Sequence, residues 1–327
     1  MQQVIKVGIM GGAGYTGGEL IRLLIHHPYV ALTFIHSKSN AGKPVHAVHQ
    51  DLLGSTDLFF ADQINPDIDV LFLCFGHGES RTFLEETPLP EAIRIIDLAN
   101  DFRLKADAII GARQFTYGLP ELNLDAIQEA KNIANPGCFA TAIQLGLLPL
   151  ASKGLVNDAY TTGITGSTGA GQSFTATSHF SWRANNIQAY KTLSHQHLKE
   201  IRQSLEQVQN NANATIAFVP WRGDFTRGIF ASTTLKTELS LDELYAAYED
   251  YYASAPFTIV SRDPISLKQV VNTNKCLIHL EKENNLVVVH SAIDNLLKGA
   301  SGQAIENMNI MFGLERTNGL QLKPSAF

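Results

Sequence analysis

The first half of the chain alternates short apolar runs with segments of helical spacing. Residues 2–10 are apolar and rich in β-branched side chains, and the glycines after them lead into a helical pattern around residues 15–27. Two prolines within 81–92 predict that a short helix ends there. Further buried strands are predicted at 30–37, 69–76 and 93–99. This alternation predicts an open, mainly parallel α/β sheet with helices on both faces, a Rossmann-type doubly wound fold.

The pattern changes after about residue 140. Segments rich in Thr and Val then alternate apolar and polar positions, which favours a largely antiparallel sheet in an α+β domain. The strands are expected at 159–167, 214–220, 228–239 and 276–294, with a hairpin turn in the last, and the covering helices at 193–211 and 241–253. We therefore expect two domains, 1–137 and 138–298, with the helical C-terminal segment 299–327 completing the first.

Composition narrows the class of partner. The 327 residues are 45% hydrophobic and 17% charged, as in ordinary globular proteins, and the net charge of -6 without a dense Lys/Arg run argues against nucleic-acid binding. No signal peptide and no apolar run of about 18 residues is visible, so no membrane partner is expected. Three cysteines without a Cys-x-x-Cys pair, and no HExxH spacing, predict neither disulfides nor a metal site. These features favour a cytoplasmic protein with a small-molecule partner.

A glycine pattern indicates a dinucleotide. Gly12-x-Gly14-x-x-Gly17 follows a predicted strand and opens a helix, where glycines let the backbone approach a pyrophosphate; a merely tight turn is the alternative. The second strand ends in His36-Ser37-Lys38-Ser39 rather than in the Asp or Glu of an NAD site, so NADP is favoured, unless Lys38 is only an exposed loop residue. The expected cofactor contacts here are Gly11, Gly12, Gly14, Tyr15, Thr16, Gly17, Ser37 and Lys38.

Cys138 follows Pro136-Gly137 and begins a predicted helix that runs to about Leu148. A thiolate at a helix N-terminus is stabilised by unpaired N–H groups and by the helix dipole, which suits a nucleophile. From this position alone, a buried structural thiol is an equally good interpretation.

The stretch IANPGCFATAIQLGLLP, residues 133–149, resembles the active-site signature of N-acyl-γ-glutamyl-phosphate reductases of arginine biosynthesis. Further stretches resemble that family in the same order, over nearly the whole chain: GGAGYTGGEL, DFRL, YGLPELN, TGSTGAG, HQH followed by EI, and ASGQAIENMNIMFGL. The resemblance implies a semialdehyde dehydrogenase or glyceraldehyde-phosphate dehydrogenase-like fold, with a second domain that serves catalysis and oligomerisation. It also implies reductive dephosphorylation: Cys138 attacks an acyl phosphate, phosphate leaves, and NADPH reduces the thioester to a semialdehyde.

The resemblance also assigns roles to other residues. His195, and less strongly His197, match the family's His-x-His element as acid/base residues, although Gln196 stands where many members have arginine and surface histidines are the alternative. Arg103 is expected to bind substrate phosphate or carboxylate, or else to pair with Asp101. The glycine loop of Gly166, Ser167, Gly169 and Gly171 is expected near nicotinamide and substrate, and Asn295, Gly302 and Gln303 as cofactor contacts. His179 is a weaker candidate, and Cys74 and Cys276 are interpreted as packing residues.

The acyl group stays open at this level. Acetyl is the common substituent in the family, but the stretch FSWRANNIQAY is unusual, and Arg183 or Lys191 would suit the extra carboxylate of a succinyl group. Another acyl-phosphate reductase, such as an aspartate-semialdehyde dehydrogenase, and a non-catalytic NADP-binding sensor are the competing hypotheses. The family suggests a homodimer or homotetramer.

Overall fold

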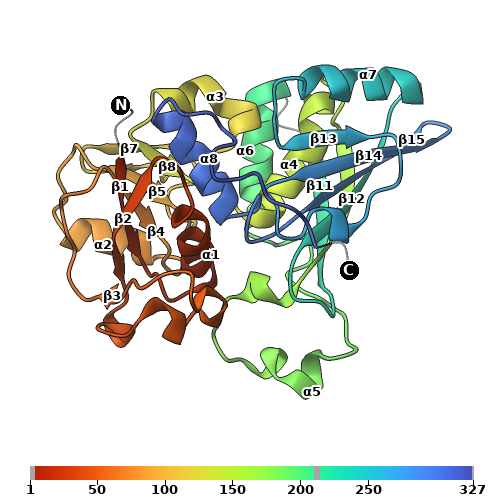
Figure 1. Cartoon of the computed structure of the whole chain (residues 1–327). Helices are drawn as coiled ribbons and strands as arrows, with labels where there is room; N and C mark the ends of the chain where they lie inside the picture. The colour runs from red at the N-terminus through yellow and green to blue at the C-terminus, as the bar shows by residue number, and fades with distance from the viewer. Residues whose placement is uncertain (1–3, 210–213, 326–327) are drawn as a thin grey trace. The chain divides into compact units, whose positions relative to one another are not determined.

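A computed structural model describes residues 4–209 and 214–325 of the chain (Figure 1). These residues form two compact units, of which unit 1 holds residues 4–136 and 300–321 and unit 2 holds residues 137–299 and 322–325 apart from 210–213. The C-terminal segment therefore differs in part from the expectation, because only its portion up to residue 321 groups with unit 1. Beyond it, the Ser325 backbone N–H donates to the Val271 carbonyl of unit 2 at 3.4 Å.

Unit 1 is built on a sheet of eight strands in the order β3-β2-β1-β4-β5-β8-β7-β6. All neighbouring strands are parallel except β6 and β7, which confirms the predicted mainly parallel sheet. The strands are β1 Ile5–Met10, β2 Val30–His36, β3 Phe60–Ala61, β4 Val70–Leu73, β5 Arg94–Asp97, β6 Ile109–Ile110, β7 Arg113–Tyr117 and β8 Asn132–Ala134. β4 is buried at every position, as expected for a strand covered on both faces.

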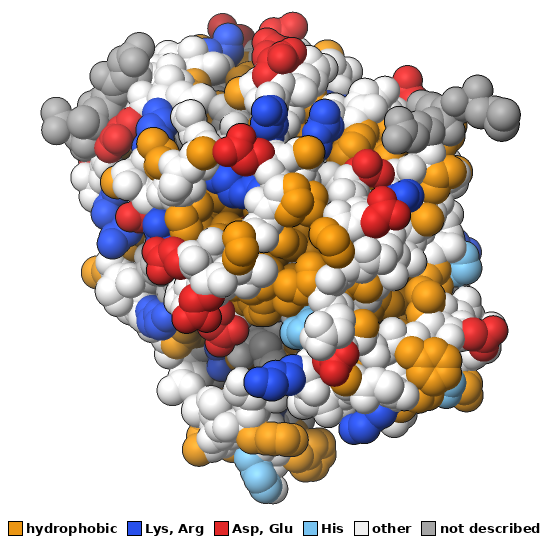
Figure 2. All heavy atoms as spheres, turned by 90° about the vertical axis from the view of Figure 1, so that its left-hand side faces the viewer, with side chains coloured by type: hydrophobic (Ala, Val, Ile, Leu, Met, Phe, Trp, Pro, Cys, Tyr) orange, Lys and Arg blue, Asp and Glu red, His pale blue; other side chains and the backbone are white. Residues whose placement is uncertain are grey.

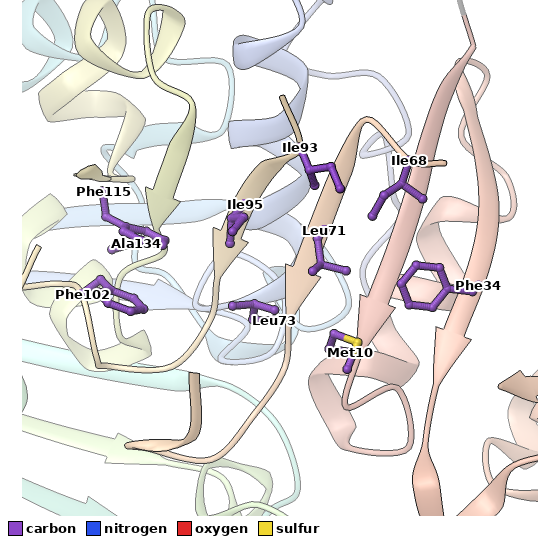
Figure 3. Packing of buried hydrophobic residues seen from close by; sticks show 10 residues of the cluster. All are labelled: Met10, Phe34, Ile68, Leu71, Leu73, Ile93, Ile95, Phe102, Phe115 and Ala134. Atoms are coloured by element: carbon purple, nitrogen blue, oxygen red, sulfur yellow. The ribbon is translucent and has the colours of Figure 1, made fainter. Parts of the chain in front are cut away.

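The helices of unit 1 are α1 Tyr15–Leu24, α2 Glu79–Glu86, α3 Pro120–Gln128 and α8 Ser301–Met311, with 3₁₀ turns η1 Lys38–Asn40, η2 Val45–Ala47 and η3 Gln50–Leu52. Figure 3 shows strand residues such as Leu71, Leu73 and Ile95 packing into one apolar cluster of this unit. In the same cluster the rings of Phe102 and Phe115 stack with centroids 4.1 Å apart. This core positions the carboxyl ends of β1, β4 and β5, where ligands bind in such sheets.

Unit 2 contains a mixed sheet of seven strands in the order β10-β11-β9-β12-β15-β14-β13. Its strands are β9 Asp158–Thr165, β10 Gln188–Ala189, β11 Thr215–Arg222, β12 Ile229–Lys236, β13 Thr258–Ser261, β14 Cys276–Glu283 and β15 Leu286–Ile293. β9 and β11 pair in parallel, as do β13 and β14, and the other pairs are antiparallel, so the sheet is largely antiparallel as predicted. The expected hairpin joins β14 to β15 through Asn284, which has a φ of 53°.

The helices of unit 2 are α4 Cys138–Ala151, α5 Phe180–Arg183, α6 His197–Gln209 and α7 Leu241–Tyr251, with 3₁₀ turns η4 Ser167–Ala170, η5 Ala176–Ser178 and η6 Leu267–Gln269. Helix α4 runs past Leu148, where the sequence predicted its end, and includes Pro149. Proline lacks the N–H that would bond to the Leu145 carbonyl one turn earlier. The Tyr252 hydroxyl donates to that carbonyl instead, so the tertiary structure supplies the missing partner.

Residues 171–187 form an arm of unit 2 with little cover. Phe174 and Phe180 on this arm are 102% and 81% exposed. At the bottom of Figure 2, at the height where Figure 1 shows α5, hydrophobic side chains are exposed on the surface. Within the described ranges, no helix combines the length and apolar character needed to cross a lipid bilayer.

Candidate active site

Cys138 is the first residue of α4 and so lies at the N-terminus of this helix. The N-cap residue is Gly137, it offers no side-chain cap, and the first turn holds no acidic residue. Glycine is also needed on the opposite side of the cysteine, because a Cβ on Gly299 would lie 2.7 Å from the Cys138 Cβ. A helix N-terminus favours a negative charge, so this position supports the nucleophilic role of Cys138, which stays a prediction.

The first turn of helix α6 contacts the N-terminus of α4. A Cβ on Gly137 would lie 2.3 Å from the His197 Nε2, so glycine at this position lets the imidazole lie against the turn. The Gly137 backbone N–H donates to the Glu200 Oε2 at 3.0 Å, and the Glu200 Oε1 is 3.9 Å from the His197 Nε2. Glu200 thus connects the start of the cysteine helix to the histidine.

His195 lies in a cage of rings beside this helix entrance. It is only 5% exposed, and its ring centroid is 5.8 Å from Phe139, 5.5 Å from Phe218 and 4.6 Å from His197. Burial, with the nearby positive charge of Lys191 as a second cause, lowers the pKa of His195 to about 4. The His195 imidazole is therefore neutral at physiological pH.

The hydrogen bonds of His195 assign its tautomer. Its Nδ1 accepts from the His197 backbone N–H at 3.3 Å. In a neutral imidazole one ring nitrogen accepts while the other carries the proton, so we assign the proton to Nε2. The ring then offers an N–H donor, which suits stabilisation of a developing oxyanion.

Tyr190 and Arg222 extend the cluster. The Tyr190 ring is 5.7 Å from the His195 ring, and the Arg222 guanidinium carbon is 4.9 Å from the Tyr190 ring centre. Burial and, second, the negative charge of the Cys138 thiolate raise the pKa of the Tyr190 hydroxyl. The cysteine, the histidine, the tyrosine and the arginine therefore belong to one continuous site in unit 2.

The glycine turn of unit 1 has the geometry of a phosphate cradle. Gly11 has a φ of 70°, and a Cβ on it would lie 2.5 Å from the Cys74 carbonyl oxygen. A Cβ on Gly17 would lie 2.7 Å from the Gly12 Cα, so the helix packs directly on the turn. Helix α1 has Gly14 as its N-cap, with neither a side-chain cap nor an acidic residue in its first turn. Its first N–H groups fit a pyrophosphate.

A cavity of about 700 Å³ lies beside this turn in unit 1. Met10, His36, Lys38 and Phe75 line it, at or after the ends of β1, β2 and β4, together with Asp62. Ser37 is buried, and its hydroxyl accepts from the Asn40 amide at 3.2 Å. The carboxylates of Glu79 and Glu86 also line the cavity. The cavity thus offers an apolar wall, a lysine and acidic groups, a lining that fits the nucleoside end of a dinucleotide.

Comparison with known proteins shows which family this chain belongs to. Residues 6–130 match the model of the semialdehyde dehydrogenase NAD binding domain, and residues 138–295 match that of the semialdehyde dehydrogenase dimerisation domain. Two curated relatives carry the name N-acetyl-gamma-glutamyl-phosphate reductase. The one from Phocaeicola vulgatus is 59% identical over 326 residues, and the one from Flavobacterium johnsoniae is 54% identical over 325; each alignment spans 99% of this chain and 100% of the relative. The chain belongs to the N-acetyl-gamma-glutamyl-phosphate reductase family.

Solved structures support the same fold at low sequence identity. Aspartate semialdehyde dehydrogenase II from Vibrio cholerae matches with a TM-score of 0.73 and 15% identity, over 94% of this chain and 98% of that one. The NADP complex of aspartate semialdehyde dehydrogenase from Candida albicans matches with a TM-score of 0.71 and 15% identity, over 94% and 98%. The expected semialdehyde dehydrogenase fold is confirmed, and the family model establishes a nicotinamide cofactor.

Several residues that the resemblance assigned to ligands are engaged within the protein. In this reductase-family chain the Arg103 guanidinium donates to the Asn135 and Leu98 carbonyls at 2.8 and 2.9 Å. The Asp101 carboxylate, its suggested partner, accepts from the Gly78 backbone N–H at 2.9 Å. The Asn295 amide bridges unit 2 loops, since it accepts from the Gly228 N–H at 2.6 Å and donates to the Thr168 hydroxyl at 3.0 Å. The ligand roles of Arg103 and Asn295 stay predictions.

The glycine loop and the C-terminal helix have clear local partners. The N–H of Gly166, the residue before η4, donates to the Gly228 carbonyl at 2.9 Å, whereas Gly169 and Gly171 lie at the exposed end of the loop. Ser167 is half-buried there. The beginning of α8 touches the glycine turn of unit 1, because the Ser301 hydroxyl donates to the Thr16 carbonyl at 2.9 Å. Gly302 and Gln303 lie buried in that first turn of α8.

The remaining sequence candidates divide by exposure. His179 is exposed on the arm, and the Lys191 ammonium donates to the Gln196 amide oxygen at 2.9 Å. Burial raises the pKa of the Cys74 thiol to about 12, and Cys276 is fully buried, so both behave as packing residues. Among the described residues, no three or more side chains of His, Cys, Asp or Glu lie close enough together to hold a metal ion.

Sequence reasoning missed Glu200, Tyr190 and Arg222. Glu200 stood in the quoted stretch after the His-x-His element, so its spacing of one helical turn from His197 was a usable signal. Tyr190 and Arg222 had no such signal. They meet because the short strand β10 pairs with the end of β11, and Gln188 there faces Arg222.

Proposed function

We propose that the chain catalyses the NADPH-dependent reduction of N-acetyl-γ-glutamyl phosphate to N-acetylglutamate 5-semialdehyde and phosphate, a step of arginine biosynthesis. The observation that carries the proposal is Cys138 at the N-terminus of α4 beside a neutral, buried His195. The family membership and the printed name of the relatives support the substrate.

In the first step the Cys138 sulfur attacks the acyl carbon, so that a C–S bond forms and the C–O bond to phosphate breaks. The negative charge that develops on the carbonyl oxygen accepts a hydrogen bond from the His195 Nε2–H. The N–H groups at the start of α4 stabilise the attacking thiolate, and Glu200 keeps this helix start in place by accepting from Gly137.

In the second step the thioester carbon is reduced and the C–S bond then breaks, which releases the semialdehyde and restores the cysteine. When bound, NADPH supplies the hydride for this reduction. His195 again faces the oxygen of the tetrahedral intermediate. Because its Nε2 carries a proton, His195 can stabilise that oxygen by donation while the C–S bond breaks.

The test of this function is the reverse reaction, in which N-acetylglutamate 5-semialdehyde, phosphate and NADP yield NADPH. We expect phosphate-dependent formation of NADPH by the wild type and a loss of several orders of magnitude in Cys138→Ser, because the un-ionised serine hydroxyl is a poorer nucleophile than the thiolate and an alkoxide is a poorer leaving group. A Cys276→Ser variant serves as the matched control. Turnover without phosphate contradicts the acyl phosphate as the reaction partner, and near-normal turnover by Cys138→Ser contradicts the covalent mechanism.

We propose NADP rather than NAD as the cofactor. Support comes from Lys38 on the wall of the unit 1 cavity and from Ser37 at the end of β2, where a 2′-phosphate finds a cation and a hydroxyl. Lys38→Ala should raise the KM for NADPH by about tenfold or more and leave the KM for NADH unchanged. Lys43→Ala, also exposed and five residues away, is the control. Equal effects on both cofactors would contradict the assignment.

We also propose a homodimer formed through the open face of the unit 2 sheet. Helix α4 packs on the other face, where the Ser291 hydroxyl donates to the Ala142 carbonyl. The open face carries Tyr160, which is 59% exposed in the middle of the sheet. Light scattering of the 35.8 kDa chain should give twice the monomer mass, with a tetramer as the alternative, and Tyr160→Lys should weaken the dimer.

We also propose that the protein is cytoplasmic. Its three cysteines form no disulfide, which is typical of proteins in a reducing compartment.

A further inference from the structure

Two arginines of unit 2 lie beside each other without a carboxylate partner. Arg183 ends α5, and its Nη2 donates to the carbonyl of Gly223, the residue after Arg222. The segment between them returns along the sheet edge, where Gln188 pairs with Arg222. After burial, the positive charge of Arg222 is the next cause that lowers the pKa of Arg183, and the negative charge of Asp224 opposes the shift by less. In the described part of the chain, no carboxylate forms an ion pair with either guanidinium.

Several donors of this pair point into the protein without an acceptor. The Nε and Nη1 of Arg183 and the Nε of Arg222 are shielded from solvent and have no hydrogen-bond partner among the described residues. Leaving guanidinium N–H groups both shielded and unpaired is costly, and placing two cations together adds repulsion. A bound anion removes both costs, because a carboxylate accepts in parallel from the fork of a guanidinium.

The arginine pair is continuous with the proposed catalytic cluster. Arg222 lies over the Tyr190 ring at 4.9 Å, and Tyr190 contacts His195 and responds to the charge of Cys138. An anion held by Arg183 and Arg222 would therefore belong to the same molecule that reacts with Cys138. Lys191, the other cation of this region, donates to Gln196 and is exposed, so it competes less well for that anion.

We infer that Arg183 and Arg222 form a binding site for a carboxylate of the N-acylglutamyl substrate, remote from the acyl group that reacts. This inference rests on the proposed function. Two carboxylates have the required chemistry: the α-carboxylate of the glutamyl part, and the terminal carboxylate of a dicarboxylic N-acyl group such as succinyl. Both arginines are then substrate-binding residues that set specificity and take no part in bond making.

The experiment compares Arg183→Gln and Arg222→Gln with the wild type in the reverse reaction, using N-acetyl- and N-succinyl-glutamate 5-semialdehyde. Each variant should raise the KM for the semialdehyde about tenfold or more, with kcat changed less than about threefold and the KM values for phosphate and NADP unchanged. Arg→Lys at either position should recover part of the affinity. Arg202→Gln, an exposed arginine of α6, is the control and should behave like the wild type.

The two substrates distinguish the two carboxylates. Equal losses for both semialdehydes assign the site to the α-carboxylate, and a loss confined to the succinyl compound assigns it to the acyl group. If the wild type is active, the inference is overturned when the arginine variants keep unchanged KM values for both semialdehydes, or change only the KM for phosphate. If the wild type is inactive, the proposed function itself is wrong, so the two failures are distinguishable.

A binding measurement guards against a folding defect. Cys138→Ser cannot turn over, so calorimetry can measure its affinity for the inert acids N-acetylglutamate and N-succinylglutamate. Adding Arg183→Gln or Arg222→Gln should weaken the binding of at least one acid about tenfold or more, with the unfolding midpoint of the protein unchanged. Unchanged affinity for both acids in these double variants contradicts the carboxylate site.

Discussion

The neutral, buried His195 should make the stability of the protein depend on pH in a predictable way. Burial lowers its pKa from 6.5 in the unfolded chain to about 4 in the folded protein. Between these values the unfolded state binds more protons than the folded state, so stability rises with pH through this window and is lost as pH falls below 6.5. Above pH 6.5 the contribution is fully present.

The size of the effect follows from the two pKa values. Lowering the pH from about 7 to about 5 protonates the unfolded imidazole almost completely and leaves the folded one nearly neutral, which removes about 2 kcal/mol of unfolding free energy. His195→Gln lacks this proton. The wild type should therefore lose about 2 kcal/mol more than His195→Gln over the same interval.

Urea unfolding of both proteins, followed by tryptophan fluorescence at the two pH values, measures this difference. His179→Gln is the matched control, because His179 lies exposed on the arm of the same unit and its removal should leave the wild-type pH response in place. If wild type and His195→Gln lose stability in parallel, to within a few tenths of a kcal/mol, His195 is not a buried neutral imidazole. The donor role proposed for its Nε2–H would then have no basis.

Three further results are expected. Gly137→Ala should lower kcat at least tenfold, measured in the reverse reaction, because its Cβ would lie 2.3 Å from the His197 Nε2 and displace the ring; retained kcat would show that the ring moves freely. Tyr252→Phe should lower the unfolding free energy by about 1–3 kcal/mol in urea titrations, since it leaves the buried Leu145 carbonyl without its partner, and no loss would contradict that reason. Burial raises the pKa of Asp97 to about 6 in the folded protein, so its contribution to stability falls as pH rises from about 4 to about 7. Relative to Asp97→Asn the wild type should lose about 2 kcal/mol over that range, and a difference independent of pH would refute the shift.

The long elements were predictable because their periodicity reports local burial. Apolar residues follow the spacing of a strand in β1, β2 and β12. They follow the spacing of a helix in α1 and α4. The two-residue strands β3, β6 and β10 were not predictable. A strand of that length has no period to detect, and it exists only because a neighbouring strand supplies its hydrogen bonds.

The sequence by itself determined the candidate nucleophile and the glycine turn of the expected cofactor site. Cys138 after Pro136-Gly137, and Gly12-x-Gly14-x-x-Gly17 after a strand, are local arrangements whose chemistry depends on the start of one helix. Only the tertiary structure decided which other residues meet in the candidate site. The low pKa of His195 comes from rings contributed by α4 and β11, and the pairing of Arg183 with Arg222 comes from a chain return along β11. Burial and charge proximity depend on every element that surrounds a group, so no local pattern could have shown them.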